Sequence, residues 1–421
     1  VVDSVLSHVA RSYVFADTAR AMVQVVRARQ AGYRDVSTPG AFADTLTAHL
    51  RAVSHDVHLG VYYRPDEYEA LLRPSAPDPD EEAERAAAER SERRERNFGY
   101  RRVEVLDGNV GYVELVRMDT PDREGGERAE AAMALVAGAD AVVLDLRKNP
   151  GGDGRMGQVL ASYFLGEDDV EWLVTNVNRS RGTERQEWSL PYVPGTRMPN
   201  TRLYILVSGN TGSAAEGLAY ALQAMGRAVV VGEPTAGGAH SGSVVPLAGG
   251  FVMFLPAGRV VSPITQSNWE GTGVQPDVRI EAARALEKAL ALVWEAAVQN
   301  AEPGSAEWDR AEWMRSYFAA KADPVVADST RLEEFAGAYV DGVVLRVIDG
   351  RLYFQRDGGA LRALMPLSPD VFVMDWLNHY GPGSYRVTFV RDEEGRVVGM
   401  RERVRHAPFE VADFDSARLS G

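Results

Sequence analysis

Residues 203–222 read Leu-Tyr-Ile-Leu-Val-Ser-Gly-Asn-Thr-Gly-Ser-Ala-Ala-Glu-Gly-Leu-Ala-Tyr-Ala-Leu. The apolar run at the start predicts a buried strand, and the apolar residues from Leu218 onward are spaced as in a helix. Ser213 lies on the turn between them, where the helix dipole and the next N–H can stabilise an oxyanion. It is therefore a candidate nucleophile. The segment also fits a Ser-x-x-Glu capping box ending at Glu216, and it does not decide between the two roles.

Similar short apolar runs surround this segment and alternate with helical patterns. They comprise residues 110–115, 141–146, 203–207 and 228–231. Near-continuous Val, Ile and Leu of this kind predict a parallel or mixed sheet that is covered by helices. We therefore expect an α/β core at residues 100–328, and its last part should hold two helices, at 282–300 and 308–321.

The flanking stretches predict three further parts. Residues 1–73 carry apolar residues at helical spacing and predict a small helical domain. Residues 74–99 pass from prolines into Glu, Arg, Ala and Ser, which is typical of a solvated linker or an exposed helix. After Ser329, two-residue alternation broken by Asp-Gly pairs predicts successive hairpins. Residues 329–421 should therefore form a small antiparallel β barrel or sandwich.

The composition limits the class of protein. A chain of 421 residues has room for roughly two to four domains, and its 45% hydrophobic and 25% charged residues are typical of soluble globular proteins. The net charge of −14 argues against nucleic acid or an anionic membrane surface as the main partner. The absence of cysteine excludes a thiol nucleophile, a disulfide framework and a thiolate metal site.

The sequence also carries signals about location. No apolar run approaches the roughly 18 residues that a membrane span needs, so no integral membrane segment is expected. The sequence starts with Val1 and not with a methionine, which suggests that an N-terminal segment has been removed. We therefore expect an exported protein, periplasmic or secreted, with a cytoplasmic location as the alternative.

A second glycine-bearing turn follows the apolar run at 141–146. It reads Asp145-Leu146-Arg147-Lys148-Asn149-Pro150-Gly151-Gly152-Asp153-Gly154. Gly151 and Gly152 let the backbone approach a ligand and aim N–H groups at it, as an oxyanion donor must. No Gly-Lys-Ser/Thr end is present, which argues against a nucleotide P-loop. Asp145 and Arg147 are expected to brace the loop.

A serine nucleophile needs a base and a group that orients the base. Among the 7 histidines, His58 precedes a predicted strand at 59–63, and His240 follows the glycine-rich segment 231–239. Glu270 lies in another glycine-rich loop, where a carboxylate can orient a histidine. The pair His55-x-x-His58 lacks a third ligand, so neither a metal nor another cofactor is expected.

Four motifs in this order resemble those of the family of C-terminal processing proteases, the tricorn protease core and the interphotoreceptor retinoid-binding protein. They lie at 145–152, 211–216, 232–238 and 273–277, and the resemblance runs from about Tyr13 to Asp277. It implies a core like that of crotonase and the Clp protease, which is a spiral of ββα units. It also implies a serine peptidase that acts on peptides or unfolded protein segments.

The branches of the resembling family differ in the residue that acts as the general base. Processing proteases carry a lysine at the position that Gly238 fills here, and of the chain's three lysines only Lys148 lies near a motif. In the tricorn branch a histidine and a glutamate complete the site, and His58 and Glu270 fill their positions. A triad of these two residues with Ser213 is thus implied. Also implied are oxyanion N–H groups from Ala214 and from Gly151 or Gly152, and a substrate-facing segment that contains Gly237, Gly238 and His240.

Two other functions remain open at this point. The retinoid-binding branch shares the helical first part and the Gly-Gly-Ala-His sequence, so a non-catalytic binder of apolar small molecules is the main alternative. A crotonase-type acyl-coenzyme A enzyme is the third possibility, although Ser213 and Glu270 would have no role there. Candidates for nucleophile, base, orienting group and oxyanion loop together favour the peptidase. Nothing in the pattern indicates an oligomeric state.

Overall fold

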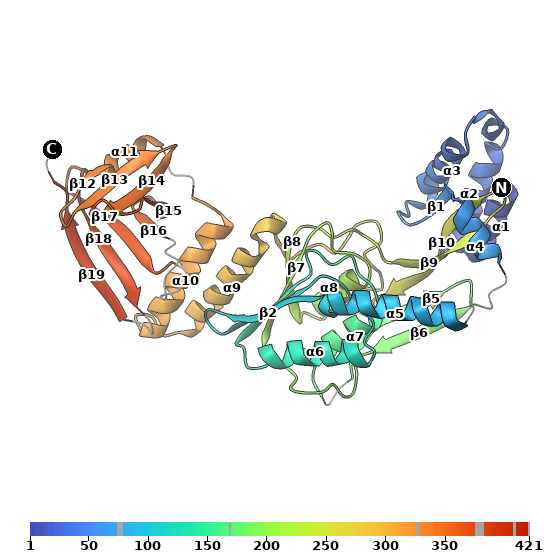
Figure 1. The fold of residues 1–421 in the computed structure, drawn as a ribbon, viewed down its shortest axis with the longest axis horizontal. Coiled ribbons are helices and arrows are strands. Elements are labelled where there is room, and N and C mark those ends of the chain that lie inside the picture. The colour runs from blue at the N-terminus through green and yellow to red at the C-terminus, as the bar shows by residue number, and fades with distance from the viewer. Residues whose placement is uncertain (74–78, 168–169, 326–328, 375–382, 407–409, 420–421) are drawn as a thin grey trace. The chain divides into compact units, whose positions relative to one another are not determined.

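The structure is a computed structural model that describes residues 1–73, 79–167, 170–325, 329–374, 383–406 and 410–419. Its internal contacts divide the chain into two compact units, Val1–Ala282 and Ala283–Gly421, and each is described here by itself (Figure 1). Residues 74–78 of the predicted linker lie outside the described residues. Within the described ranges, no helix is long and apolar enough to cross a membrane.

The first unit begins with helices, as predicted. They are α1 (Val2–Ser12), α2 (Ala16–Ala28), η1 (Gly32–Asp35), α3 (Pro39–Ser54) and α4 (Pro65–Leu72). Their apolar stripes pack into one core, in which Val9, Met22 and Leu50 are fully buried. Strand β1 (Gly60–Tyr63) follows α3 and pairs with β10 (Phe251–Val261), in the register Gly60 opposite Phe254. This pairing fixes the helical part to a strand far along the chain.

The charged stretch after this part forms an exposed helix, which was one of the two predicted forms. It is α5 (Pro79–Glu95), followed by η2 (Asn97–Gly99). Ion pairs attach it to the core, because Arg93 contacts Asp122 at 2.6 Å and Arg96 contacts Asp119 at 2.8 Å.

A six-stranded mixed sheet forms the centre of the first unit and confirms the predicted sheet. In spatial order it consists of β11 (Val278–Arg279), β8 (Ala228–Gly232), β7 (Arg202–Val207), β4 (Ala141–Asp145), β3 (Val110–Leu115) and β2 (Tyr100–Leu106). Only β2 is antiparallel to its neighbour. Because β4 and β7 are parallel neighbours, with Leu144 opposite Ile205, the loops that follow them leave the same edge of the sheet.

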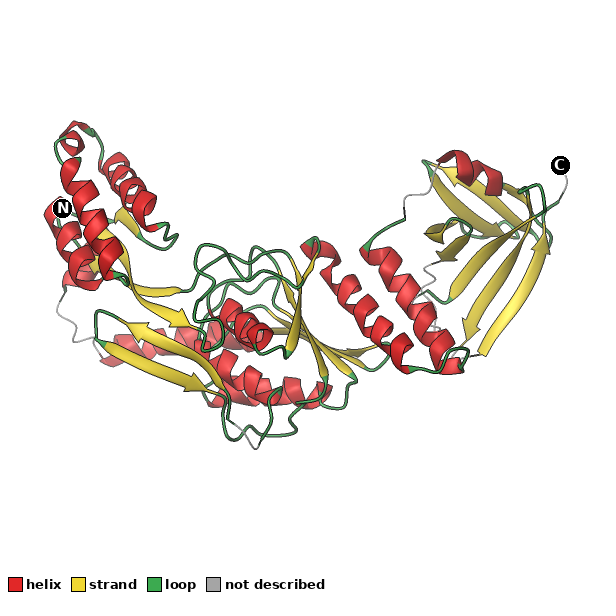
Figure 2. Ribbon diagram, turned by 180° about the vertical axis from the view of Figure 1, so that it is seen from behind, coloured by secondary structure: helices red, strands yellow, loops and turns green. Residues whose placement is uncertain are grey.

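Helices α6 (Arg123–Val136), α7 (Gly154–Tyr163) and α8 (Ala214–Ala224) lie next to this sheet (Figure 2).

The first unit also contains a second, antiparallel sheet. Its order is β1, β10, β5 (Trp172–Asn178) and β6 (Thr183–Trp188), and β9 (His240–Pro246) also pairs with β10. Strands β5, β6, β9 and β10 were not predicted. Most side chains of β6 are exposed, so β6 has no apolar alternation to reveal it.

The second unit confirms the predicted hairpins. After η3 (Ala282–Arg284) come α9 (Ala285–Asn300), α10 (Ala306–Ala322) and α11 (Ser329–Phe335), then β12 (Gly337–Ala338), β13 (Val343–Ile348), β14 (Arg351–Arg356), β15 (Arg362–Ser368), β16 (Val371–Met374), β17 (Tyr385–Arg391), β18 (Val397–His406) and β19 (Glu410–Ala417). Each strand pairs with the next, and a bridge between Tyr339 and Arg418 joins the two ends of the sheet.

These elements confirm the α/β fold class, with a helical first part and an antiparallel C-terminal sheet. The contacts group α9 and α10 with the C-terminal sheet and not with the sheet of the first unit, although the sequence was divided after residue 328. The division into stretches 1–73, 74–99, 100–328 and 329–421 stays a prediction.

Candidate active site

Ser213 occupies the turn between β7 and α8 in a strained backbone conformation. Its φ is 50° and its ψ is −119°, although it is not a glycine, and its side chain is exposed. Such outliers cost about 1–3 kcal/mol and cluster at functional sites. Ser213 is the N-cap of α8 and forms a capping box with Glu216, whose Oε2 accepts the Ser213 N–H at 2.7 Å. The side chain is nevertheless exposed to the adjoining cavity, where its hydroxyl can meet a ligand.

Glu216 connects this turn to the glycine-rich segment after β8. Its side chain is fully buried, and Oε2 accepts the N–H groups of both Ser213 and Gly238, the second at 2.9 Å. Oε1 accepts the Thr235 hydroxyl at 2.5 Å and the Gly237 N–H at 2.7 Å. Four donors therefore compensate the burial of one carboxylate. From the sequence, Glu216 was only a capping residue, because its other partners are distant along the chain.

The loop after β4 lies directly against the serine turn. A Cβ on Gly151, whose φ is +102°, would come within 2.7 Å of the Ser213 Cβ and 3.0 Å of the Ala214 nitrogen. The Gly151 N–H donates to Oδ1 of Asn149 at 2.9 Å and is therefore engaged. Gly152 and Ala214 line a cavity together with Ser213. Their N–H groups are thus the remaining candidates for the oxyanion hole.

The predicted bracing of this loop is seen in the structure. The Arg147 guanidinium donates to both carboxylate oxygens of Asp145, at 2.6 Å for the Nη2 contact, and it also reaches the Ala282 carbonyl at 2.6 Å. Lys148 points elsewhere: its Nζ contacts Oε1 of Glu114 at 3.0 Å, and its side chain is 63% exposed.

His58 lies in the turn just before β1. Oδ1 of Asp56 accepts the N–H groups of His58 at 3.0 Å and Leu59 at 3.3 Å, which fixes this turn. The ring Nδ1 lies 3.5 Å from Oε1 of Glu270, and neither atom has another hydrogen-bond partner among the described residues. The interaction with Glu270 raises the pKa of His58, although partial burial opposes the shift.

The ring of His58 fills the space next to Gly238. A Cβ built on Gly238 would lie 2.8 Å from Cε1 and 3.0 Å from Nε2 of this imidazole. The Gly238 N–H shares the carboxylate oxygen Oε2 of Glu216 with the Ser213 N–H. Gly238 therefore lies between the imidazole of His58 and the carboxylate that holds the serine turn.

We expect Gly238→Ala to lower kcat/KM at least about tenfold in a peptide hydrolysis assay, because its methyl group displaces the imidazole that it would touch at 3.0 Å or less. Gly209→Ala is the matched control, since a Cβ on Gly209, in the turn after β7, meets nothing within 4 Å. Equal activity of the two variants would contradict the placement of His58.

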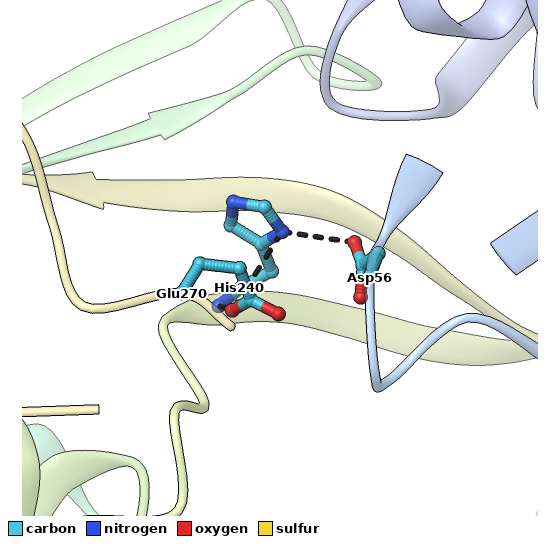
Figure 3. Close-up of side chains that lie close together, drawn as sticks. All are labelled: Asp56, His240 and Glu270. Atoms are coloured by element: carbon cyan, nitrogen blue, oxygen red, sulfur yellow. Dashed lines mark hydrogen bonds and ion pairs between the residues drawn. The ribbon is translucent and has the colours of Figure 1, made fainter. Parts of the chain in front are cut away.

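Glu270 and His240 belong to the same cluster (Figure 3). Oε2 of Glu270 accepts the N–H groups of Ala239 at 2.6 Å and His240 at 2.8 Å, so its other oxygen faces His58. Nδ1 of His240 lies 2.9 Å from Oδ2 of Asp56, which also accepts the buried hydroxyl of Tyr13 at 3.1 Å. Sequence reasoning missed Asp56, whose only local signal is its position two residues before His58.

The donor atoms of Asp56, His240 and Glu270 lie within 4.8 Å of one another, a spacing that a metal ion also requires. Their contacts with each other and with backbone N–H groups account for this spacing without an ion. Burial alone would raise the pKa of Asp56, but the hydrogen bonds from His240, from the His58 N–H and from Tyr13 hold the pKa below its ordinary value. Asp56 is therefore an ionised acceptor at neutral pH.

A cavity of about 470 Å³ opens beside Ser213. Gly152, Ala214, Gly238 and His240 line it near the serine. The wall also includes Leu218 of α8, Trp269 of the loop between β10 and β11, and the hairpin β5–β6. Such a mixture of an apolar wall and a few polar groups is typical of ligand-binding cavities.

Comparison with known proteins gives consistent matches. Carboxyl-terminal-processing protease of a Picosynechococcus species is 39% identical over 140 residues, which are 33% of this chain and 32% of that protein. Carboxyl-terminal-processing peptidase 3, chloroplastic, of Arabidopsis thaliana is 30% identical over 175 residues, 41% of this chain and 32% of that protein. The chain thus spans about a third of the length of these relatives. The solved photosystem II D1 C-terminal processing protease is 27% identical, with a TM-score of 0.35, and the match covers 43% of this chain and 45% of that one.

Two family models match adjoining parts of the chain. Residues 1–98 match the N-terminal domain of Peptidase_S41 in eukaryotic IRBP, and residues 109–280 match Peptidase family S41. Together the two models account for most of the first unit, including all the candidate site residues. The chain belongs to peptidase family S41.

Proposed function

We propose that this chain is a serine peptidase that hydrolyses peptide bonds in peptides or unfolded protein segments. The observation that carries the proposal is the contact of the His58 imidazole with Gly238, whose N–H shares a Glu216 oxygen with the Ser213 N–H. The same imidazole lies 3.5 Å from a carboxylate oxygen of Glu270. Family membership supports the reaction class, because the matching model and relatives are peptidases.

In the proposed mechanism, Ser213 attacks the peptide carbonyl while Nε2 of His58 takes the hydroxyl proton. Glu270 accepts the Nδ1 proton, orients the ring and stabilises the imidazolium that forms. The N–H groups of Ala214 and Gly152 hold the oxyanion of the tetrahedral intermediate. The imidazolium then protonates the leaving amine, and water releases the acyl group from Ser213 by the same route. Catalytic hydrogen bonds commonly shorten when substrate binds, which suits the 3.5 Å separation.

The main alternative is a non-catalytic binder of apolar small molecules that uses the same cavity. A binder has no need for an exposed serine in a strained turn, nor for a histidine paired with a carboxylate. A fluorophosphonate probe distinguishes the two, because it labels an activated serine covalently. We expect labelling of the wild-type chain and none of Ser213→Ala. An unlabelled wild-type chain would favour the binder. The crotonase-type reading leaves Ser213 and Glu270 without roles.

We also propose a location outside the cytoplasm. The proposal rests on the relative from Arabidopsis thaliana, which carries the description chloroplastic. Fractionation of cells that produce the protein, followed by detection of the chain in each fraction, tests this proposal. Recovery in the cytoplasmic fraction alone would contradict it.

The pKa of His58 has a direct consequence for the pH dependence of activity. The base is active only when neutral, so a pKa raised above 6.5 places the acid limb of kcat/KM above that pH. Glu270→Gln removes the carboxylate that raises this pKa. We therefore expect the acid limb to move to lower pH and kcat to fall about 10–100-fold, both measured from pH 5 to 9. Glu233→Gln in the neighbouring glycine-rich segment is the control. An acid limb that stays in place in Glu270→Gln would contradict the pairing.

A further inference from the structure

His240 has one ring nitrogen that the site as described does not use. Its side chain is only 4% exposed, and Nε2 is buried without a hydrogen-bond partner among the described residues. Such an atom is uncommon, because buried polar atoms in folded proteins are nearly always paired. His240 lines the cavity beside Ser213, and Figure 3 shows its second nitrogen pointing away from Asp56 and Glu270.

The protonation of this ring follows from its neighbours. The ionised carboxylate of Asp56 can only accept, so Nδ1 of His240 carries a proton and donates it at 2.9 Å. Tyr13 donates to the same oxygen, and burial together with Asp56 raises the pKa of its hydroxyl, so Tyr13 stays a donor. In the neutral ring, Nε2 is therefore a lone-pair acceptor. Phe15 lies edge-on to the ring at 5.4 Å and offers it no polar contact.

The backbone of His240 is held as firmly as the ring. Its N–H donates to Glu270 at 2.8 Å, and it begins β9 opposite Arg259 of β10. The ring is thus fixed at the main chain and at Nδ1, while Nε2 remains free. An acceptor that is already fixed in place does not have to be ordered when a ligand binds, so it favours a donor that arrives in the matching position.

We propose that His240 is a substrate-positioning residue whose Nε2 accepts a hydrogen bond from one backbone N–H of the peptide bound in the cavity, with Asp56 holding the ring in the accepting tautomer. This inference rests on the proposed peptidase function, since it assumes that the cavity holds a peptide. It assigns His240 to ligand orientation and leaves proton transfer to His58. The ligand group is a main-chain amide, so the contact is independent of the substrate's side chains.

Binding to the inactive variant Ser213→Ala tests the inference separately from catalysis. The probes are a fluorescein-labelled apolar decapeptide and a series of its esters, in which one backbone N–H at a time is replaced by oxygen. Fluorescence anisotropy gives each Kd. We expect one ester position to raise Kd about tenfold, because it leaves Nε2 buried and unpaired. In Ser213→Ala/His240→Asn, that penalty should fall below about twofold, since Asn keeps a donor toward Asp56 but lacks the Nε2 acceptor.

Two further variants make the test sharper. His240→Gln places an amide near the Nε2 position and should retain part of the ester penalty, which also keeps the test decisive if His240→Asn does not fold. Asp56→Asn presents N–H groups to Nδ1, so the proton should move to Nε2 and the same ester should bind as well as the amide or better. Thermal unfolding checks that each variant is folded.

Several results would overturn the inference. They are an ester series without a sensitive position, an unchanged penalty in folded His240→Asn, the loss of the penalty in folded His240→Gln, and the absence of peptide binding. If the wild-type chain still hydrolyses peptides in any of these cases, only the role of His240 fails. If the wild-type chain neither hydrolyses peptides nor reacts with the fluorophosphonate probe, the proposed function fails as well.

Discussion

Replacing Ser213 by alanine is expected to lower peptide hydrolysis by at least about 10³-fold while leaving the melting temperature within a few degrees of wild type. Alanine keeps the Cβ that packs near Gly151 and loses only the hydroxyl. Turnover of a fluorogenic peptide and thermal unfolding measure the two effects. A serine that acted only as a cap would show the opposite pattern, with a stability loss of about 0.5–2 kcal/mol and unchanged turnover.

The strained backbone at Ser213 supplies a matched control. Ser213→Gly also lacks the hydroxyl, but glycine adopts a φ of 50° without steric cost. We expect this variant to be inactive and at least as stable as Ser213→Ala. Turnover near the wild-type level in either variant would remove Ser213 from the mechanism.

Replacing His58 by alanine should lower kcat by several orders of magnitude, because it removes the proposed base, whose Nδ1 lies 3.5 Å from Glu270. His240 also lies 3.7 Å from Glu270, but its Nδ1 is closer to Asp56, at 2.9 Å. The probe reaction of Ser213 should be lost in parallel, since it needs the same base. Both readouts are compared with the melting temperature, which separates loss of the base from loss of the fold.

Lys148 and His240 are the controls for this assignment. Lys148→Ala should retain substantial activity, because its ammonium group contacts Glu114 and the histidine route needs no amine. His240→Ala should mainly raise KM. Near-normal turnover of His58→Ala together with a folded, inactive His240→Ala would transfer the role of base to His240, and an inactive, folded Lys148→Ala would restore a serine–lysine pair.

Much of the fold could be predicted because its signals are local. Strands β3 and β4 are buried along their whole length, and β7 is buried after its first residue, so all three appear as apolar runs. The hairpins of the second unit alternate apolar and polar residues and turn at pairs such as Asp349-Gly350, both of which have positive φ. Strand β6 left no such trace, because neither of its faces is buried.

The site was less accessible to sequence reasoning, because its contacts join distant segments. Local patterns made Ser213 a candidate nucleophile or a cap and left His58 and His240 as alternative bases, and only the family resemblance chose between them. The reason why residue 238 is a glycine became visible only when the ring of His58 was placed against it. The contact of Asp56 with His240 spans 184 positions and left no local pattern. The capping box indicated Glu216 but not its bonds to the segment after β8.

The pairing of β1 with β10 has a consequence for the time at which activity can appear. Gly60 and Phe254 meet across this ladder, and closing so long a loop carries a large entropic cost that folding meets late. Translation must therefore pass β10 before the proposed base and nucleophile can meet, and pass Glu270 before the proposed triad is complete. Nascent chains, and chains in which this four-residue ladder opens, expose unfolded segments while the proposed triad is incomplete, so the topology would limit self-digestion.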